Sequence, residues 1–403
     1  MTRTRLAGVL AWAVAVVVLA APVQPAAAKG SQGAKQQPAI VSLGDSFIAG
    51  ESGRWAGNTN RSFADVDALG PTAYFDNATA TAEQIPMCHR SRTSAVHIGG
   101  KVTSINLACG GATAGTQWDG PDFKPGLDFF DDGNGNRGQA ALLRDVATSA
   151  DVRLIAISIG LNDFNFRGVV TACVTDFLTS TQIFPNYCHD DEVVRTSTST
   201  VAVDGVRAGI VAGLRNVRQA MREAGRADGS YDVVVQLNPS PVPPGQQLRY
   251  NEGGYDRYTI GGCPFWNADA DWLARTYLPL VSRTAREAVA ESGLRRIHVL
   301  DATRALDGHR VCEKGVGMLE EKNLSSWTAT NAVDLTEWAS QVRTVTTLGS
   351  PYFIQESVHP NYWGQQALQA CLRLAWNGGK VRGGTCTIAG TGLSGGDPRM
   401  TLK

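Results

Sequence analysis

The pattern of apolar residues predicts an α/β fold, a three-layer α/β/α sandwich around a central parallel sheet of about five strands. Residues 154–159 form a continuous apolar run, which is typical of a parallel strand buried on both faces. Other runs predict strands at 40–43, 101–107, 231–237 and 296–300. Helical spacing at 201–225, 272–290 and 364–376 predicts helices between and after these strands. Alternation of the two kinds of element favours parallel pairing, because parallel strands need long crossover connections.

The length and the net charge of the chain limit the number of domains and the kinds of partner that we expect. Its 403 residues are enough for a large core, and we expect one domain at 39–386 with loop insertions and a flexible tail at 387–403. Lys plus Arg and Asp plus Glu both number 37, so the formal net charge is zero. Nothing in this balance favours nucleic acid as a partner, whereas contact with a neutral or zwitterionic surface stays open.

The N-terminal residues have the pattern of a secretory signal. Arg3 and Arg5 precede an apolar run at 6–21, and small residues at 26–28 offer a cleavage site. A membrane anchor is the alternative, but the run is shorter than the ~20 residues that span a bilayer. We therefore expect a signal peptide at 1–28, a flexible leader at 29–38, and a secreted, extracellular protein.

The even number of cysteines agrees with export. Eight cysteines in an exported chain favour disulfides over free thiols, although they allow 105 connectivities. Pairing each cysteine with its neighbour in the sequence closes four loops that do not cross. A zinc site is the alternative, but no Cys-x-x-Cys occurs, so no metal is expected. The predicted pairs are Cys88 with Cys109, Cys173 with Cys188, Cys263 with Cys312, and Cys371 with Cys386.

Four short motifs carry residues suited to chemistry at the ends of predicted elements. Gly44-Asp45-Ser46 ends the first strand, where open α/β sheets place their sites. Residues 107–113, with Cys109-Gly110-Gly111, end the second strand. Gly160-Leu161-Asn162-Asp163 ends the third, and Ser357-Val358-His359 lies near the C-terminus. A serine needs a neighbouring base to become a nucleophile, so the ordered set means more than any one motif.

Ser, Gly, Asn and His in this order resemble the four blocks of the SGNH (GDSL) hydrolase family. The amino-acid sequences at 88–91, 108–113 and 356–361 are similar to those of secreted actinobacterial lipases and esterases of this family. The resemblance covers most of the chain after residue 38. It implies a flavodoxin-like sheet topology and hydrolysis of carboxylic esters without a metal or organic cofactor.

The resemblance also implies a role for each block. Ser46 would be the nucleophile at the start of a helix, and His359 its base. The N–H groups of Ser46 and Gly111 with the side-chain amide of Asn162 would form the oxyanion hole, because these donors bring no competing charge. His359 is preferred on this ground among the six histidines at 89, 97, 189, 298, 309 and 359.

Glu356 is the one departure from the family pattern. The family usually has an aspartate three residues before the histidine, where a carboxylate orients the imidazole. Glutamate is longer, so its head group can overshoot the ring. We therefore favour a Ser-His dyad oriented by a backbone carbonyl, or a weakly assisted triad, with Glu356 facing solvent or an arginine.

Two further motifs are set aside. The acidic, glycine-rich stretch at 131–136 lacks the ligand spacing and closing glutamate of a calcium-binding EF-hand, so a solvated turn is predicted. Residues 392–396 fit Gly-x-Ser-x-Gly, but no apolar strand precedes them, as that motif requires. The stretch at 239–264 is expected to shape the substrate site, and 302–350 has no clear assignment.

The substrate class is open because one Ser-His centre serves several kinds of ester. The resemblance favours lipid esters, as for a lipase, phospholipase or lysophospholipase. An acetyl-carbohydrate esterase is the enzymatic alternative, and a non-catalytic surface- or carbohydrate-binding protein is the alternative of another class. The expected partners are a small-molecule or lipid ester and, transiently, lipid surfaces, with the chain a monomer.

Overall fold

A sheet of seven strands organises the part of the chain that the structure describes. The structure is a computed structural model that describes residues 36–342 and 354–403. In order across the sheet, the strands are β2 (Thr103–Asn106), β1 (Pro38–Gly44), β5 (Asp151–Ser158), β6 (Asp232–Leu237), β7 (Ile297–Asp301), β8 (Gly384–Ser394) and β9 (Asp397–Leu402). The first six pair in parallel, and β9 pairs antiparallel with β8.

The five strands predicted from the sequence form the parallel core of this sheet. Numbered among themselves, they lie in the order 2-1-3-4-5, which is the flavodoxin-like order. Ser42 pairs with both Asn106 of β2 and Ala156 of β5. The strand β1 therefore lies between β2 and β5, whose ends flank its carboxyl end.

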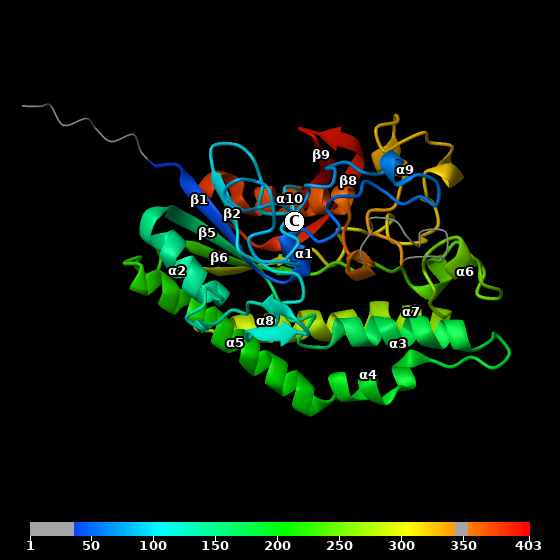
Figure 1. The fold of residues 1–403 in the computed structure, drawn as a ribbon, viewed down its shortest axis with the longest axis horizontal. Helices are drawn as coiled ribbons and strands as arrows, with labels where there is room; N and C mark the ends of the chain where they lie inside the picture. The colour runs from blue at the N-terminus through cyan, green and yellow to red at the C-terminus, as the bar shows by residue number, and fades with distance from the viewer. Residues whose placement is uncertain (1–35, 343–353) are drawn as a thin grey trace, which may run out of the picture. The chain divides into compact units, whose positions relative to one another are not determined.

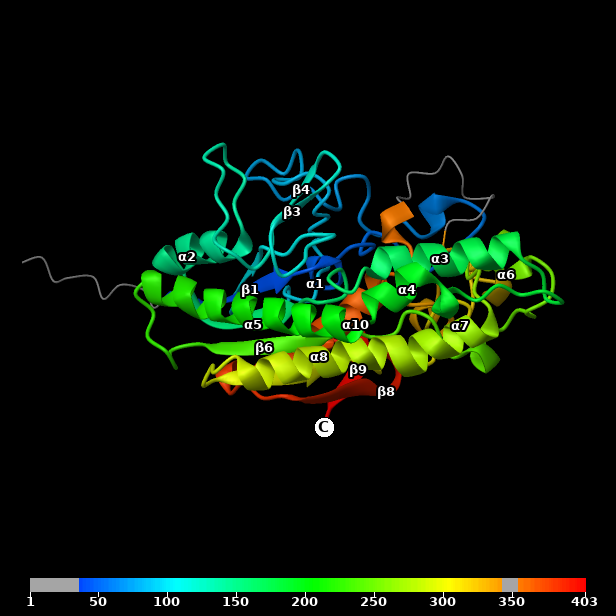
Figure 2. The same ribbon diagram turned by 90° about the horizontal axis from the view of Figure 1, so that it is seen from below.

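Helices cover both faces of the sheet. The helices with at least six residues are α2 (Gln139–Ser149), α3 (Phe166–Thr179), α4 (Glu192–Ser197), α5 (Thr200–Glu223), α7 (Asn267–Trp272), α8 (Leu278–Glu291) and α10 (Tyr362–Trp376). Shorter ones are α1 (Ser46–Ala49), α6 (Asp256–Thr259) and α9 (Ala332–Leu335). Figures 1 and 2 show α2, α5 and α8 together on one face and α10 on the other.

The alternation of side chains along the strands explains the three layers. Val41 of β1 and Ile155 of β5 pack in one hydrophobic cluster with residues of α2, α5 and α8 such as Leu214. Ile40 and Leu154 pack in a second cluster with residues of α10. Because successive side chains of a strand point to opposite faces, a strand covered on both sides is apolar throughout.

Some elements were not predicted from the sequence. The stretch between Cys173 and Cys188 belongs in part to α3, and α2 had no prediction. A small hairpin of β3 (Gln117–Asp119) and β4 (Asp122–Lys124) stands apart from the main sheet. The described part of the unassigned stretch, 302–342, holds little regular structure beyond α9.

The prediction of a flexible tail at 387–403 is wrong. These residues belong to β8 and β9, and Leu402 is buried in the same cluster as α10. Asp397 of β9 pairs with Arg373 of α10. The apolar side chains of this hairpin are widely spaced, so its sequence resembles a polar tail even though it covers the edge of the sheet.

The four predicted disulfides are present. Cys88 is bonded to Cys109, Cys173 to Cys188, Cys263 to Cys312, and Cys371 to Cys386. The first bridge fixes the segment that follows β2 and leads to Gly111, and the last ties α10 to β8. By restricting the unfolded chain, each bridge stabilises the fold by roughly 3 kcal/mol.

The predicted signal peptide at 1–28, and the leader as far as residue 35, lie outside the described residues. Within the described ranges, no helix has both the length and the apolar character needed to cross a membrane.

We predict that Leu402→Ala destabilises the protein by about 2–5 kcal/mol, because it removes a buried side chain from a packed cluster. Arg399→Ala, at an exposed position of the same strand, is the matched control. Thermal unfolding of the two variants checks the prediction. A flexible tail would leave both melting temperatures at the wild-type value.

Candidate active site

The turn after β1 presents Ser46. Gly44 has φ +118°, and a Cβ there would lie 1.8 Å from the carbonyl oxygen of Ser158, so this close approach of two strands requires glycine. Asp45 caps α1 by accepting a hydrogen bond from the N–H of Phe47. Ser46 is the first residue of that helix, where backbone donors have no partner within the helix. Ser46 thus lies at the start of α1, at the carboxyl edge of the sheet.

His359 contacts Ser46 directly. Its Nε2 lies 2.6 Å from Ser46 Oγ, and its Nδ1 lies 3.0 Å from the carbonyl oxygen of Ser357. A carbonyl accepts only from a protonated nitrogen, so Nδ1 carries the hydrogen and Nε2 is left to accept. Burial lowers the pKa of His359 below its usual value. The imidazole is therefore neutral at neutral pH and placed to take the proton of Ser46.

The loop that holds His359 is fixed from both ends. Val358 has φ +55°, an uncommon conformation for a β-branched residue. The N–H of Val358 donates to Ser340 O at 2.8 Å, and the N–H of Ser340 donates to His359 O at 2.9 Å. Asn361 then caps α10 by accepting from the N–H groups of Trp363 and Gly364. These hydrogen bonds together hold His359 in a fixed position.

Glu356 does not orient His359. Its Oε2 accepts from Trp55 Nε1 at 2.9 Å, and its Oε1 accepts from the hydroxyl of Tyr74. Its side chain is fully buried. The expectation that Glu356 faces solvent is wrong, because Trp55 and Tyr74 enclose its carboxylate. The other alternative, an arginine, agrees with the electrostatic interaction between Glu356 and Arg54. The structure places the carbonyl oxygen of Ser357, and not a carboxylate, against Nδ1 of His359.

Gly111 and Asn162 lie at the same edge of the sheet as Ser46. The N–H of Cys109 donates to Gly44 O at 3.0 Å, which joins the Gly111 segment to the end of β1. Asn162 Nδ2 donates to Ala112 O at 2.9 Å, which ties the end of β5 to the same segment. Gly111 has φ +81°, and a Cβ there would lie 3.3 Å from the side chain of Lys124. The three predicted oxyanion donors therefore lie on neighbouring, hydrogen-bonded segments.

Two buried carboxyl groups flank this edge. Asp45 Oδ1 accepts from Phe47 N–H and Ser158 Oγ, and Asp163 Oδ1 accepts from the N–H of Ala114. Burial raises the pKa of Asp45 to about 7 and that of Asp163 to about 6. Near pH 6, Asp45 is mostly neutral, so it adds little negative charge beside Ser46.

A buried ion pair that sequence reasoning missed adjoins the site. Glu51 Oε1 lies 2.5 Å from His89 Nδ1, and the side-chain nitrogen of Gln355 donates to the same oxygen at 3.0 Å. In the sequence, His89 stood out as part of the motif at 88–91 and not as a partner of Glu51, which follows Ser46 by five residues. Only the fold brings these side chains together.

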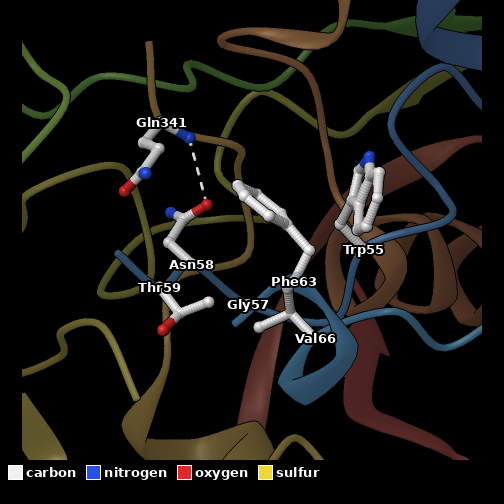
Figure 3. A pocket seen from close by; sticks show the side chains of 7 residues that line it. All are labelled: Trp55, Gly57, Asn58, Thr59, Phe63, Val66 and Gln341. Atoms are coloured by element: carbon white, nitrogen blue, oxygen red, sulfur yellow. Dashed lines mark hydrogen bonds between the residues drawn. The ribbon is translucent and has the colours of Figure 1, made fainter. Parts of the chain in front are cut away.

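A pocket beside Trp55 is separate from the Ser-His centre. Its lining residues, shown in Figure 3, are Trp55, Gly57, Asn58, Thr59, Phe63, Val66 and Gln341. The dashed line in the figure is the hydrogen bond from the backbone N–H of Gln341 to Asn58 Oδ1, 3.1 Å long. Because neither Ser46 nor His359 lines this pocket, we assign it no part in the chemistry.

In the described ranges, one group of three possible metal ligands has atoms close enough to share an ion. It consists of Cys173, Cys188 and Asp269. Both cysteines are in a disulfide, and Asp269 accepts from His189 Nδ1 at 2.7 Å. This group is a structural cluster that joins α3 to Cys188 and to α7.

Comparisons with known proteins give distant structural likenesses. No family model and no curated protein matches the sequence. An extracellular lipase from Streptomyces rimosus is 18% identical over 83% of this chain and 98% of its own, with a TM-score of 0.40. Phospholipase A1 from Streptomyces albidoflavus is 16% identical over the same shares, with a TM-score of 0.42. A carbohydrate acetylesterase from Sinorhizobium meliloti is 10% identical over 65% of this chain and 84% of its own, with a TM-score of 0.28.

We predict that Asp45→Asn increases stability at pH 8 more than at pH 5. The raised pKa means that folded wild-type protein holds a proton which the unfolded chain releases near pH 4, so wild-type stability falls as the pH rises toward 7. Asparagine caps the helix equally well and does not titrate. Each pKa unit is worth up to about 1.4 kcal/mol. Melting temperatures across pH 5–8 measure the difference.

The control is Asp132→Asn, at an exposed turn where hydrogen bonds from Asn136 and Asn134 lower the pKa of the carboxyl. Asp132 is ionised throughout this range, so the effect of its substitution should not change with pH. A difference for Asp45→Asn that is equally independent of pH contradicts the prediction.

We predict that Glu356→Gln lowers kcat by less than about tenfold, and lowers the melting temperature because the amide NH2 faces the donor of either Trp55 or Tyr74, where a carboxylate oxygen accepts. Steady-state kinetics and thermal unfolding give the two readouts. A loss of about 10⁴ in kcat, as for amide substitution of a triad aspartate, contradicts the dyad.

Proposed function

We propose that the protein is an exported serine hydrolase of the SGNH type that cleaves carboxylic esters, and that its substrates are lipid esters. The observation that carries the proposal is the 2.6 Å contact between Ser46 Oγ and His359 Nε2, with Nδ1 held by the carbonyl of Ser357. This is the geometry of an activated hydroxyl nucleophile. The flavodoxin-like strand order and four disulfides agree with the proposed class and compartment.

The proposed reaction begins with attack of Ser46 Oγ on the ester carbonyl carbon. The hydroxyl proton passes to His359 Nε2, and the carbonyl electron pair moves to the oxygen, which becomes an oxyanion. The N–H groups of Ser46 and Gly111 and the amide of Asn162 donate to that oxygen. When the tetrahedral intermediate collapses, the alcohol leaves with the proton from His359, and Ser46 carries the acyl group.

Water completes the cycle by the same steps. His359 accepts a proton from a water molecule as its oxygen attacks the acyl carbon, and the oxyanion donors stabilise the second intermediate. Collapse breaks the bond to Ser46 Oγ, which recovers the proton from His359. The carboxylic acid is released, and every group of the chain returns to its initial state.

Exposed apolar side chains near the site support a lipid substrate. Ile354 is 71% exposed and lies five residues before His359. Trp118 of β3 is 51% exposed and packs on Phe123, and the partner strand β4 supplies the Lys124 side chain that lies against Gly111. We infer that apolar side chains on these two segments contact an acyl chain rather than an acetylated sugar.

We predict that Ser46→Ala lowers kcat for ester hydrolysis by about 10⁴ or more while the protein stays folded, because no nucleophile remains. The assay uses p-nitrophenyl esters of increasing chain length, with phosphatidylcholine and acetylated xylan as further substrates. We expect turnover to rise with acyl length.

Ser394→Ala is the matched control, because Ser394 occupies the Gly-x-Ser-x-Gly motif in the exposed part of β8. It should keep wild-type activity. Loss of activity in Ser394→Ala rather than Ser46→Ala contradicts the assigned nucleophile. Turnover restricted to acetylated xylan contradicts the lipid substrate and supports the carbohydrate esterase, and a folded wild type without esterase activity supports the binding protein.

A further inference from the structure

In a Ser-His dyad, no carboxylate at Nδ1 stabilises the positive charge that forms on the histidine. In this chain Nδ1 contacts the Ser357 carbonyl, and Glu356 is engaged with Trp55 and Tyr74. Proton transfer from Ser46 creates an imidazolium at a position that is almost completely buried. Burial disfavours such a charge unless an opposite charge lies nearby. Stabilising the His359 imidazolium therefore requires a negative charge near the ring.

Glu51 is placed to supply it. The residue follows α1, and its backbone N–H donates to Ser46 O at 3.1 Å. Its Oε1 accepts from the side chain of Gln355, four residues before His359. Its Oε2 lies against Gly110, where an added Cβ would approach it within 2.4 Å. Glu51 thus contacts the three segments that carry the proposed nucleophile, base and oxyanion glycine, the first through its backbone N–H and the other two through its carboxylate.

His89 keeps this carboxylate ionised although it is buried. Burial alone would lower the pKa of His89, but Glu51 and Glu83 raise it to about 9, so His89 is a cation at neutral pH. Burial alone would raise the pKa of Glu51, but His89 and the other contacts lower it below its usual value. The ring of Tyr74 stacks on His89 with centroids 4.4 Å apart. Glu51 is consequently charged and held in place.

The charged groups around Glu51 differ in their effect on His359. Burial lowers the pKa of His359, Glu51 and the Ser357 carbonyl oppose this shift, and His89 adds to it. Glu83 and Glu356 face His89, and Lys124 and Tyr74 also interact with Glu51. Among these groups, Glu51 is the carboxylate whose field acts on His359.

We propose that Glu51 is a positioning residue that stabilises the His359 imidazolium through space, in place of the acid of a Ser-His-Asp triad, while Gln355 and His89 fix its carboxylate. This inference rests on the proposed ester hydrolysis. Glu51 contacts neither substrate nor Ser46 Oγ, so its effect falls on the protonation of the base and on kcat rather than on substrate binding.

The test compares two isosteric charge variants by the pH dependence of kcat/KM, whose acidic limb reports the ionisation of His359 in the free enzyme. Glu51→Gln removes the negative charge, so the limb should move to lower pH and kcat should fall about tenfold or more, with little change in KM. A tenfold loss corresponds to one pKa unit. Gln355→Glu adds a negative charge beside the same ion pair, so the limb should move to higher pH.

Glu51→Asp and Glu83→Gln are the controls. Glu51→Asp keeps the charge and should restore the acidic limb to its wild-type position. Glu83 contacts His89, through a hydrogen bond of 3.0 Å from the His89 N–H, and has no hydrogen bond to the Ser46, Gly111 or His359 segments among the described residues. Its substitution should leave kcat within a few-fold of wild type.

The proposal is overturned if Glu51→Gln loses activity in proportion to lost folded protein while its acidic limb stays at the wild-type pH, which is the result of a purely structural role. If Glu51→Gln does not fold, the Gln355→Glu variant alone tests the proposal. The proposal is then overturned if the acidic limb of kcat/KM for Gln355→Glu stays at the wild-type pH or moves to lower pH. Failure of the proposed function is a separate result, because wild-type protein would then hydrolyse no ester.

Discussion

The hydrogen bond between Ser46 and His359 joins residues 313 positions apart, and the rest of the structure holds its two ends together. One end is rigid because Ser46 lies two residues after β1, an inner strand that pairs in parallel with both of its neighbours. The other end is a loop with a strained residue, Val358, secured by backbone bonds to Ser340. A hydrogen bond from the N–H of Tyr362 to Trp55 O, 2.7 Å long, adds a direct tie between the two regions.

Control of buried charge is the second requirement of this arrangement. His359 must be neutral to accept a proton, and burial provides this by lowering its pKa. Burial also raises the pKa of Asp45, which limits the negative charge beside Ser46. The ionised Glu51–His89 pair brings a fixed negative charge near the base without adding net charge to the interior. Each ionisable group therefore has its protonation state set by burial together with a specific neighbour.

Local sequence patterns predicted the parts that depend on local physics. Five parallel strands are recognisable because burial on both faces requires apolar runs. The roles of Ser46, Gly111, Asn162 and His359 came from the family resemblance, and the structure places these residues at the ends of such runs or near a helix start. The hairpin of β8 and β9 was missed because its stability comes from packing against α10 rather than from its own pattern. The position of Glu356 and the Glu51–His89 pair depend on contacts between distant segments, which no spacing in the sequence records.

The central claim is that Ser46 is the nucleophile of a Ser-His dyad, and covalent trapping tests it most directly. The folded wild-type protein is treated with a fluorophosphonate, digested, and mapped by mass spectrometry, with residual ester hydrolysis followed in parallel. The account predicts one adduct per chain, on the peptide that contains Ser46, with activity lost in proportion to labelling. An adduct on any other residue that accounts for the lost activity, or full ester hydrolysis by protein labelled at Ser46, would contradict it.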